Sequence, residues 1–179
     1  VVTDVNTGDT LALVSYPGYD TNRLANSIDA EYYAKLMNDE ARPMYSRATQ
    51  ERTAPGSTYK MVSATAGLME GAITTTTSLG CKGPFDKISP PPRCHIYPGA
   101  HGMLNVSGAI QRSCNNFFYE VGYRLGSVGD SYNSERGTDM LAKYADMYGL
   151  SETSGLEVEE TDPKLSTEDA VRSSIGQGN

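Results

Sequence analysis

The stretch Pro55-Gly56-Ser57-Thr58-Tyr59-Lys60 gives the clearest indication of both the fold and the chemistry of this chain. The pair Pro55-Gly56 is typical of a break, and an apolar run follows it, so we predict a helix that begins at Ser57 and ends near Gly71. Residues three apart on a helix are neighbours, about 4.5 Å apart along its axis. The sequence therefore predicts that Ser57 and Lys60 lie side by side in a first helical turn.

A serine and a lysine in this arrangement can act as a nucleophile and its base. The free N–H groups at a helix N-terminus favour the negative charge that develops on Ser57 as it reacts. Loss of water lowers the pKa of a lysine, which lets a neutral Lys60 take the hydroxyl proton. Gly56 is expected to let a substrate backbone approach closely. One Ser-x-x-Lys match is expected by chance in a chain of this length, so the prediction needs a second element.

Ser113-Cys114-Asn115 supplies that second element. Side chains two positions apart diverge by about 200° on a continuous helix, so Ser113 and Asn115 can face one cleft only if the helix breaks there. We predict a break between helices at 106–112 and 116–125. Ser113 could then relay a proton while the Asn115 amide holds a substrate carbonyl. A similar motif, Ser131-Tyr132-Asn133, lies in a polar stretch and is interpreted as an exposed loop or a helix cap.

The rest of the chain predicts a mixed α/β fold of the α+β type, with strands concentrated at the start. Residues 1–15 predict a hairpin in which Leu11–Val14 is a buried strand. Further helices are predicted at 28–37 and 139–148, and residues 74–102 form an excursion rich in Thr, Pro and Gly. The helix after Ser57 carries an apolar stripe expected to face the core, made of Met61, Ala64, Thr65 and Leu68.

Composition excludes several classes of protein. The 179 residues are 38% hydrophobic, enough for one domain with a real core, and no apolar run approaches the length of a membrane span. Fifteen basic and 22 acidic residues give a net charge of −7, without the basic cluster that a nucleic-acid partner needs. Three cysteines are too few for a disulfide scaffold.

These motifs together resemble the penicillin-binding transpeptidase family, most closely its monofunctional class B enzymes. The resemblance spans essentially the whole chain. Besides the two serine motifs, it rests on Asp4–Asp9 with Leu11–Pro17, Asn22, Arg47-Ala48, His101-Gly102, Ser154–Glu157 and Ile175–Gly178.

The resemblance implies a sandwich of helices around a mainly antiparallel sheet, with residues 1–179 forming part of one transpeptidase domain. It implies D,D-transpeptidation: Ser57 attacks the D-Ala-D-Ala bond of a peptidoglycan stem peptide and passes the acyl group to an amine of a neighbouring strand. Lys60 and Ser113 would be catalytic, Asn115 and Gly56 substrate-binding, and β-lactams would acylate the same serine. It implies no cofactor, and a location on the outer face of the bacterial membrane, anchored by a segment not seen here.

One family motif, Lys-Thr-Gly or Lys-Ser-Gly, is missing, because no lysine of the chain is followed by Ser/Thr-Gly. We therefore expect a piece of a longer polypeptide that is inactive alone or is paired with a second polypeptide carrying the missing strands. A D,D-carboxypeptidase, a β-lactamase and a β-lactam sensor of the same fold remain alternatives. A non-catalytic binding or scaffold module is the alternative from another class.

The excursion is bracketed by Cys81 and Cys94, with His95 and His101 close by in the sequence. Three interpretations stay open: a Zn²⁺ site, a disulfide, or neither. The spacing matches no compact zinc signature, so no metal ligand is assigned among these four residues. Cys114 is interpreted as core packing rather than as a nucleophile.

Overall fold

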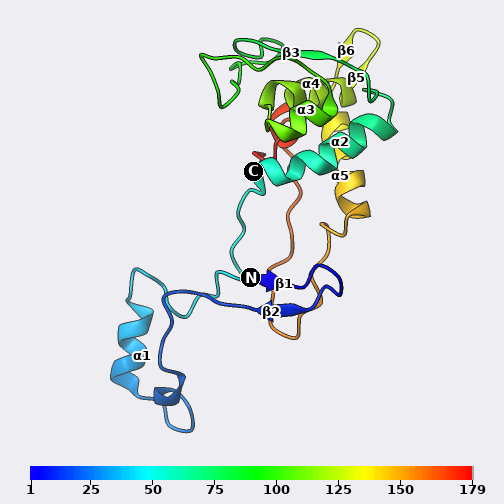
Figure 1. Ribbon diagram of the computed structural model, residues 1–179. Helices are drawn as coiled ribbons and strands as arrows, with labels where there is room; N and C mark the ends of the chain where they lie inside the picture. The colour runs from blue at the N-terminus through cyan, green and yellow to red at the C-terminus, as the bar shows by residue number, and fades with distance from the viewer. Residues whose placement is uncertain (179) are drawn as a thin grey trace. The chain divides into compact units, whose positions relative to one another are not determined.

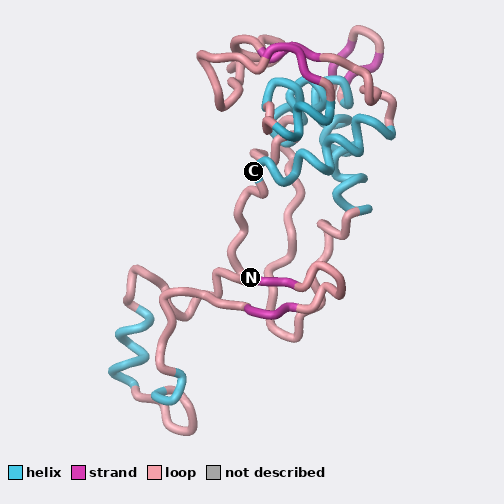
Figure 2. The backbone as a smooth tube through the Cα atoms, viewed as in Figure 1, coloured by secondary structure: helices cyan, strands magenta, loops and turns pink. Residues whose placement is uncertain are grey.

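The chain divides into two compact units in the computed structural model, which describes residues 1–178 (Figure 1). The first unit comprises Val1–Arg52 and Thr153–Thr161. The second comprises Thr53–Glu152 and the residues from Asp162 onward. Most of the helix lies in the second unit, whereas the first is largely loop (Figure 2). Each unit is therefore described by itself.

The first unit contains a short hairpin, the 3-10 helix η1 (Thr21–Arg23) and one α-helix. Strand β1 (Val2–Thr3) pairs antiparallel with β2 (Thr10–Ala12), as predicted for residues 1–15. Helix α1 (Ala30–Met37) begins after Asp29, whose carboxylate accepts a hydrogen bond from the Tyr32 N–H at 3.0 Å. Its predicted position is confirmed to within two residues.

The predicted burial of Leu11–Val14 is wrong. Leu11 is 66% exposed and Val14 is 73% exposed. The apolar run predicts a strand correctly, but burial requires a second layer, and no strand within residues 1–178 other than β1 pairs with β2. The alternation of residues in the sequence does not show which other part of the protein would cover the strand.

The second unit holds the remaining helices and two further hairpins. In chain order its elements are η2 (Gly56–Tyr59), α2 (Lys60–Met69), β3 (Leu79–Cys81), β4 (Gly102–Leu104), α3 (Val106–Gln111), α4 (Asn115–Leu125), β5 (Ser127–Val128), β6 (Ser131–Tyr132), α5 (Ser134–Met147) and α6 (Ala170–Ser173). β3 pairs antiparallel with β4 and closes the base of the 74–102 excursion, while β5 pairs antiparallel with β6.

Helix α4 is the centre of the second unit and packs against α2, α5 and α6. Its side chains Phe117, Phe118 and Val121 are at most 1% exposed. Burying each such side chain stabilises a fold by roughly 1.5–3 kcal/mol, so this helix anchors the loops at either end of it. One of those loops carries Ser113.

The predicted stripe on α2 is buried only in part: Ala64 is buried and Leu68 packs against the core, but the stripe omits other buried positions. Met61 is 52% exposed, whereas Ser63 and Ala66 are fully buried. The Ser63 hydroxyl donates to the Ser174 carbonyl at 2.7 Å, which satisfies its buried polar group. Small residues let neighbouring chain approach closely, and a stripe chosen by hydrophobicity alone misses that face.

The sheets within residues 1–178 are three separate two-stranded antiparallel pairs. The predicted mixture of helices with antiparallel strands is therefore present, while the strands do not join into one sheet within that range. Among the helices of residues 1–178, none has the length and apolar character that crossing a bilayer requires.

Candidate active site

Ser57 and Lys60 lie together where η2 leads into α2, as the sequence predicts. The Lys60 amine donates a hydrogen bond to Ser57 Oγ at 3.0 Å. Lys60 is only 2% exposed, whereas Ser57 is exposed to solvent. Burial lowers the pKa of Lys60 below its ordinary value of 10.5. The arrangement thus joins an accessible hydroxyl to an amine that gives up its proton more readily than a surface lysine.

The predicted break in the second helical region is confirmed. Helix α3 ends at Gln111 and α4 begins at Asn115, and between them Ser113 adopts a φ of 50°. This left-handed conformation costs a non-glycine residue about 1–2 kcal/mol. It brings both side chains of the motif to Lys60, whose amine donates to Ser113 Oγ at 2.9 Å and to Asn115 Oδ1 at 2.7 Å.

The four side chains form one hydrogen-bonded group. Ser113 Oγ donates to Ser57 Oγ at 2.8 Å, and the Lys60 amine also donates to the Ser113 carbonyl at 2.8 Å. An ammonium carries three protons, fewer than the four oxygens around this amine. A hydroxyl partner can therefore become the donor once the amine is neutral. The geometry allows a proton to pass among Ser57, Lys60 and Ser113.

A backbone contact holds the segment that precedes the serine. The Gly56 N–H donates to the Gly176 carbonyl at 3.0 Å. Both glycines have positive φ, 59° at Gly56 and 71° at Gly176. A Cβ on Gly176 would stand 2.3 Å from the Gly56 carbonyl oxygen, so only glycine fits there. The end of α6 thus fixes the position at which the chain enters η2.

A cleft of about 240 Å³ opens beside these residues. It is lined by Ser57, Ser113, Asn115, His95, Ile175 and Gln177. Three of the residues predicted for the site therefore line the cleft, and Lys60 lies against them from the buried side. The sequence interpretation did not assign Ile175 and Gln177 to the cleft, although their segment, Ile175–Gly178, is one of the motifs on which the family resemblance rests.

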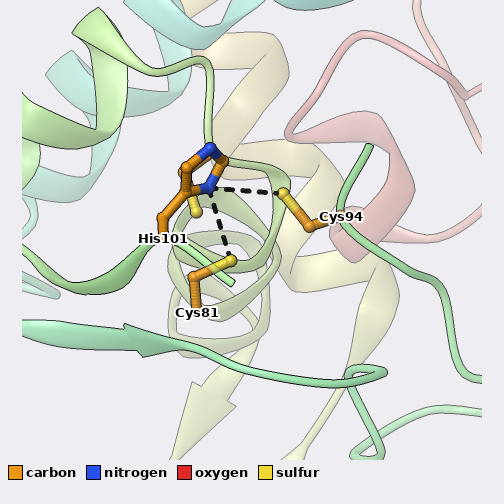
Figure 3. Close-up of side chains that lie close together, drawn as sticks. Cys81, Cys94 and His101 are labelled. Atoms are coloured by element: carbon orange, nitrogen blue, oxygen red, sulfur yellow. Dashed lines mark hydrogen bonds between the residues drawn. The ribbon is translucent and has the colours of Figure 1, made fainter. Parts of the chain in front are cut away.

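A second cluster lies next to the first. Cys81, Cys94, His101 and Cys114 place their ligand atoms within 4.8 Å of one another. His101 Nδ1 lies 3.4 Å from Cys81 Sγ and 3.7 Å from Cys94 Sγ, and Figure 3 shows the three side chains pointing toward one another. All three cysteines are free thiols, so the disulfide interpretation is not realised. His95 is not a member of this cluster.

The donor set of this cluster fits a structural Zn²⁺ site. Three sulfurs and one imidazole are a usual tetrahedral set, and Zn–S bonds of about 2.3 Å put sulfurs about 3.8 Å apart. Burial opposes ionisation of Cys94, but hydrogen bonds from neighbouring backbone N–H groups lower the pKa of its thiol. Burial raises the pKa of Cys114 to about 12. The sequence interpretation missed Cys114 as a member of this cluster because its partners are distant along the chain.

The second Ser-x-Asn motif, Ser131-Tyr132-Asn133, does not line the cleft. Ser131 is exposed in β6, and Asn133 Oδ1 caps α5 by accepting from the Arg136 N–H at 3.0 Å. Tyr59, between Ser57 and Lys60, turns away and donates to the Leu141 carbonyl at 3.3 Å. The structure thus brings together Ser57, Lys60, Ser113 and Asn115 and leaves the similar motif apart.

Comparison with known proteins gives a consistent picture. The family model of the penicillin-binding protein transpeptidase domain matches residues 1–178. Peptidoglycan D,D-transpeptidase MrdA of Escherichia coli K12 is 34% identical over 161 residues, which cover 89% of this chain and 24% of MrdA. Peptidoglycan D,D-transpeptidase PbpA of Mycobacterium tuberculosis is 33% identical over 134 residues, covering 71% of this chain and 27% of PbpA. The chain thus spans about a quarter of the length of these relatives.

Solved structures agree at the level of the fold. The crystal structure of PBPA from Mycobacterium tuberculosis superposes with a TM-score of 0.74 at 30% identity, covering 98% of this chain and 40% of that one. The penicillin G acyl-enzyme complex of the same protein gives a TM-score of 0.68 at 30% identity, covering 94% of this chain and 39% of that one. A peptidoglycan synthase complex that coordinates polymerization and crosslinking gives 0.82 at 29% identity, covering 98% and 31%.

Proposed function

The chain belongs to the penicillin-binding protein transpeptidase family, and from this premise we propose that it carries the nucleophile of a serine D,D-transpeptidase that cross-links peptidoglycan stem peptides. The observation that carries the proposal is the hydrogen-bonded group of Ser57, Lys60, Ser113 and Asn115 at the cleft. The whole protein would act outside the bacterial cytoplasmic membrane, where peptidoglycan lies.

The first half-reaction would form an acyl-enzyme. Lys60 in its neutral form takes the hydroxyl proton while Ser57 Oγ attacks the carbonyl of the D-Ala-D-Ala bond. The C–N bond then breaks, and the departing D-Ala amine receives a proton through Ser113. Asn115 would hold the substrate through its amide, and the glycine pair at 56 and 176 would keep the approach to Ser57 open.

The second half-reaction would transfer the acyl group to an amine of a neighbouring strand. The amine attacks the ester, a C–N bond forms, and Ser57 recovers its proton as the C–O bond breaks. Hydrolysis instead would need a base to activate water. A D,D-carboxypeptidase and a β-lactamase of the same fold are the hydrolytic alternatives, in which water takes the acyl group from Ser57.

The test is the mass of the full-length protein before and after incubation with excess penicillin G. We expect one penicilloyl adduct that maps to Ser57 and is absent in Ser57→Ala. Lys60→Ala should slow acylation about 10²–10⁴-fold, the usual contribution of a general base. Lys143→Ala is the matched control, because Lys143 is an exposed lysine paired with Glu70. Absence of an adduct, or an adduct elsewhere, would favour the binding or scaffold module instead.

We also propose that Cys81, Cys94, His101 and Cys114 bind a structural Zn²⁺ ion. The cluster ties the base of the excursion to the loop between α3 and α4. When bound, the ion would stabilise the thiolates and cross-link these segments. No catalytic step is assigned to it.

Metal analysis of the full-length protein tests this assignment. We expect about one zinc per chain, lost in Cys94→Ala and retained in Asp86→Ala, an exposed position of the same excursion outside the cluster. Removal of the metal by a chelator should lower the unfolding temperature of the unchanged protein and leave that of Cys94→Ala unaltered. Freshly purified, reduced protein without bound metal would rule the site out.

A further inference from the structure

One side chain that lines the cleft, His95, has no role in the proposed mechanism but can form hydrogen bonds. Of the six residues that line it, Ser57, Ser113 and Asn115 have proposed roles. Ile175 is apolar and Gln177 is a neutral amide. His95 is the single aromatic and the single ionisable group among the described residues of this lining.

The position of His95 is set by its neighbour in the chain. Cys94 is 4% exposed, and its sulfur accepts a hydrogen bond from the Asn115 N–H at 3.3 Å. This contact joins the segment that carries His95 to the start of α4. The residue that precedes His95 in the chain is therefore held against the main chain of Asn115, which also lines the cleft.

The ring of His95 is restrained on one side and available on the other. Its Nδ1 lies 3.8 Å from Cys94 Sγ, and its centroid lies 5.4 Å from that of the His101 ring, at an interplanar angle of 54°. Nε2 has no hydrogen-bond partner within residues 1–178, and the residue as a whole is exposed. A ring held through one edge offers its free nitrogen to a molecule in the cleft at little cost in side-chain entropy.

We propose that His95 is a specificity-determining residue that binds the acyl-donor peptide. Its Nε2–H donates a hydrogen bond to an acceptor oxygen of the peptide, next to the amide that Asn115 holds. That oxygen is a main-chain carbonyl or a side-chain carboxylate, since an imidazole N–H suits either. This inference rests on the transpeptidase function proposed above and extends it to the recognition of the donor.

The test compares two acylating probes on the full-length protein. One is a stem peptide ending in D-Ala-D-Ala, and the other is penicillin G, which carries no stem-peptide chain. In His95→Ala we expect KM for the peptide to rise about fivefold, which is the loss of affinity expected when one hydrogen bond is removed. We expect kcat to change less. The ratio of the peptide constant kcat/KM to the penicillin acylation constant should fall by a similar factor.

Two further variants separate recognition from a structural effect. His95→Gln replaces the Nε2–H donor by an amide N–H and should recover most of the peptide KM, whereas Asp86→Ala should match the unchanged protein. Repeating the assay with a peptide whose side-chain carboxylate is amidated identifies the acceptor. The His95→Ala effect persists with the amidated peptide if a main-chain carbonyl is bound and disappears if the carboxylate is bound.

The proposal is overturned if His95→Ala loses the same factor toward both probes, if KM for the peptide is unchanged, or if the variant loses its bound metal together with its activity. Failure of the transpeptidase proposal itself looks different. It would show in the unchanged protein, as a lack of acylation at Ser57, and not in the comparison between variants.

Discussion

The Lys60 amine is surrounded by oxygen atoms of neutral groups, from Ser57, Ser113 and Asn115. A carboxylate at this distance would stabilise the ammonium and raise its pKa. None of the ion pairs found within residues 1–178 involves Lys60, which leaves burial as the main effect on its pKa. The same side chain on the protein surface would stay protonated at neutral pH.

The lowered pKa of Lys60 predicts how acylation depends on pH. Because only the neutral amine accepts a proton, the rate of acylation by penicillin G should rise as pH increases through the lowered pKa. It should level off below pH 10.5, the ordinary lysine value. Stopped-flow acylation of the full-length protein, between pH 5 and the upper limit of stability, measures this profile. A rate that does not change with pH would remove Lys60 from the role of base.

At the scale of single elements, the turn between α3 and α4 combines a conformational cost with a chemical role. Ser113 needs a φ of 50° and also supplies the hydroxyl. Ser113→Ala and Ser113→Gly both remove the hydroxyl, so both should slow acylation. Only glycine relieves the backbone, so Ser113→Gly should unfold with a free energy about 1 kcal/mol higher than Ser113→Ala. Equal unfolding free energies in denaturant titrations would show that the turn is not strained.

The contact between η2 and the end of α6 makes a similarly specific prediction. Gly176→Ala adds a methyl group 2.3 Å from the Gly56 carbonyl oxygen, which must displace the entry to Ser57. Acylation should fall about tenfold or more, since small displacements of a nucleophile are costly. Gly71→Ala is the matched control, with a φ of 69° and nothing within 4 Å of the added methyl group. Both variants lose the stability that a side chain at positive φ costs, Gly176→Ala loses more because of its clash, and acylation in Gly71→Ala should be unaffected.

Local patterns predicted these elements where the cause is local. The helix predicted at 28–37 matches α1 to within two residues, and the opposite directions of Ser113 and Asn115 on a continuous helix predicted the break after α3. The buried face of α2 was predicted only in part: Ala64 is buried as expected, but Ser63 and Ala66 are buried through the surfaces they meet and not through their own hydrophobicity. Sequence patterns predict an element better than the face it buries.

At the scale of the whole chain, apolar burial is concentrated in the second unit. Its central helix α4 is almost fully enclosed, whereas the β1–β2 hairpin of the first unit exposes Val2 and Leu11. Local stability follows buried apolar contacts. In hydrogen exchange of the 179-residue chain, amides of α4 should be the slowest and those of Thr10–Ala12 among the fastest. Comparable protection of the two segments would show that the hairpin has a partner surface.

The sequence predicted the candidate site only where its residues lie close together along the chain in a recognisable motif. The spacing of Ser57 and Lys60 and the Ser113–Asn115 motif directly indicated the four residues that form the hydrogen-bonded group. Gln177 at the cleft and Cys114 in the cysteine–histidine cluster were missed, because each acquires its neighbours through packing. Single-sequence patterns do not encode which distant segments meet.

The hydrogen bond between Gly56 and Gly176 also has a consequence for biosynthesis. A ribosome releases Ser57 and Lys60 long before it releases Gly176, so the emerging chain carries both reactive groups without the segment that fixes their entry. Ser57 can therefore reach the position described above only after the segment that follows α6 has been translated and has docked. An acylating antibiotic that meets the growing chain earlier would find a serine and a lysine, but not yet the site.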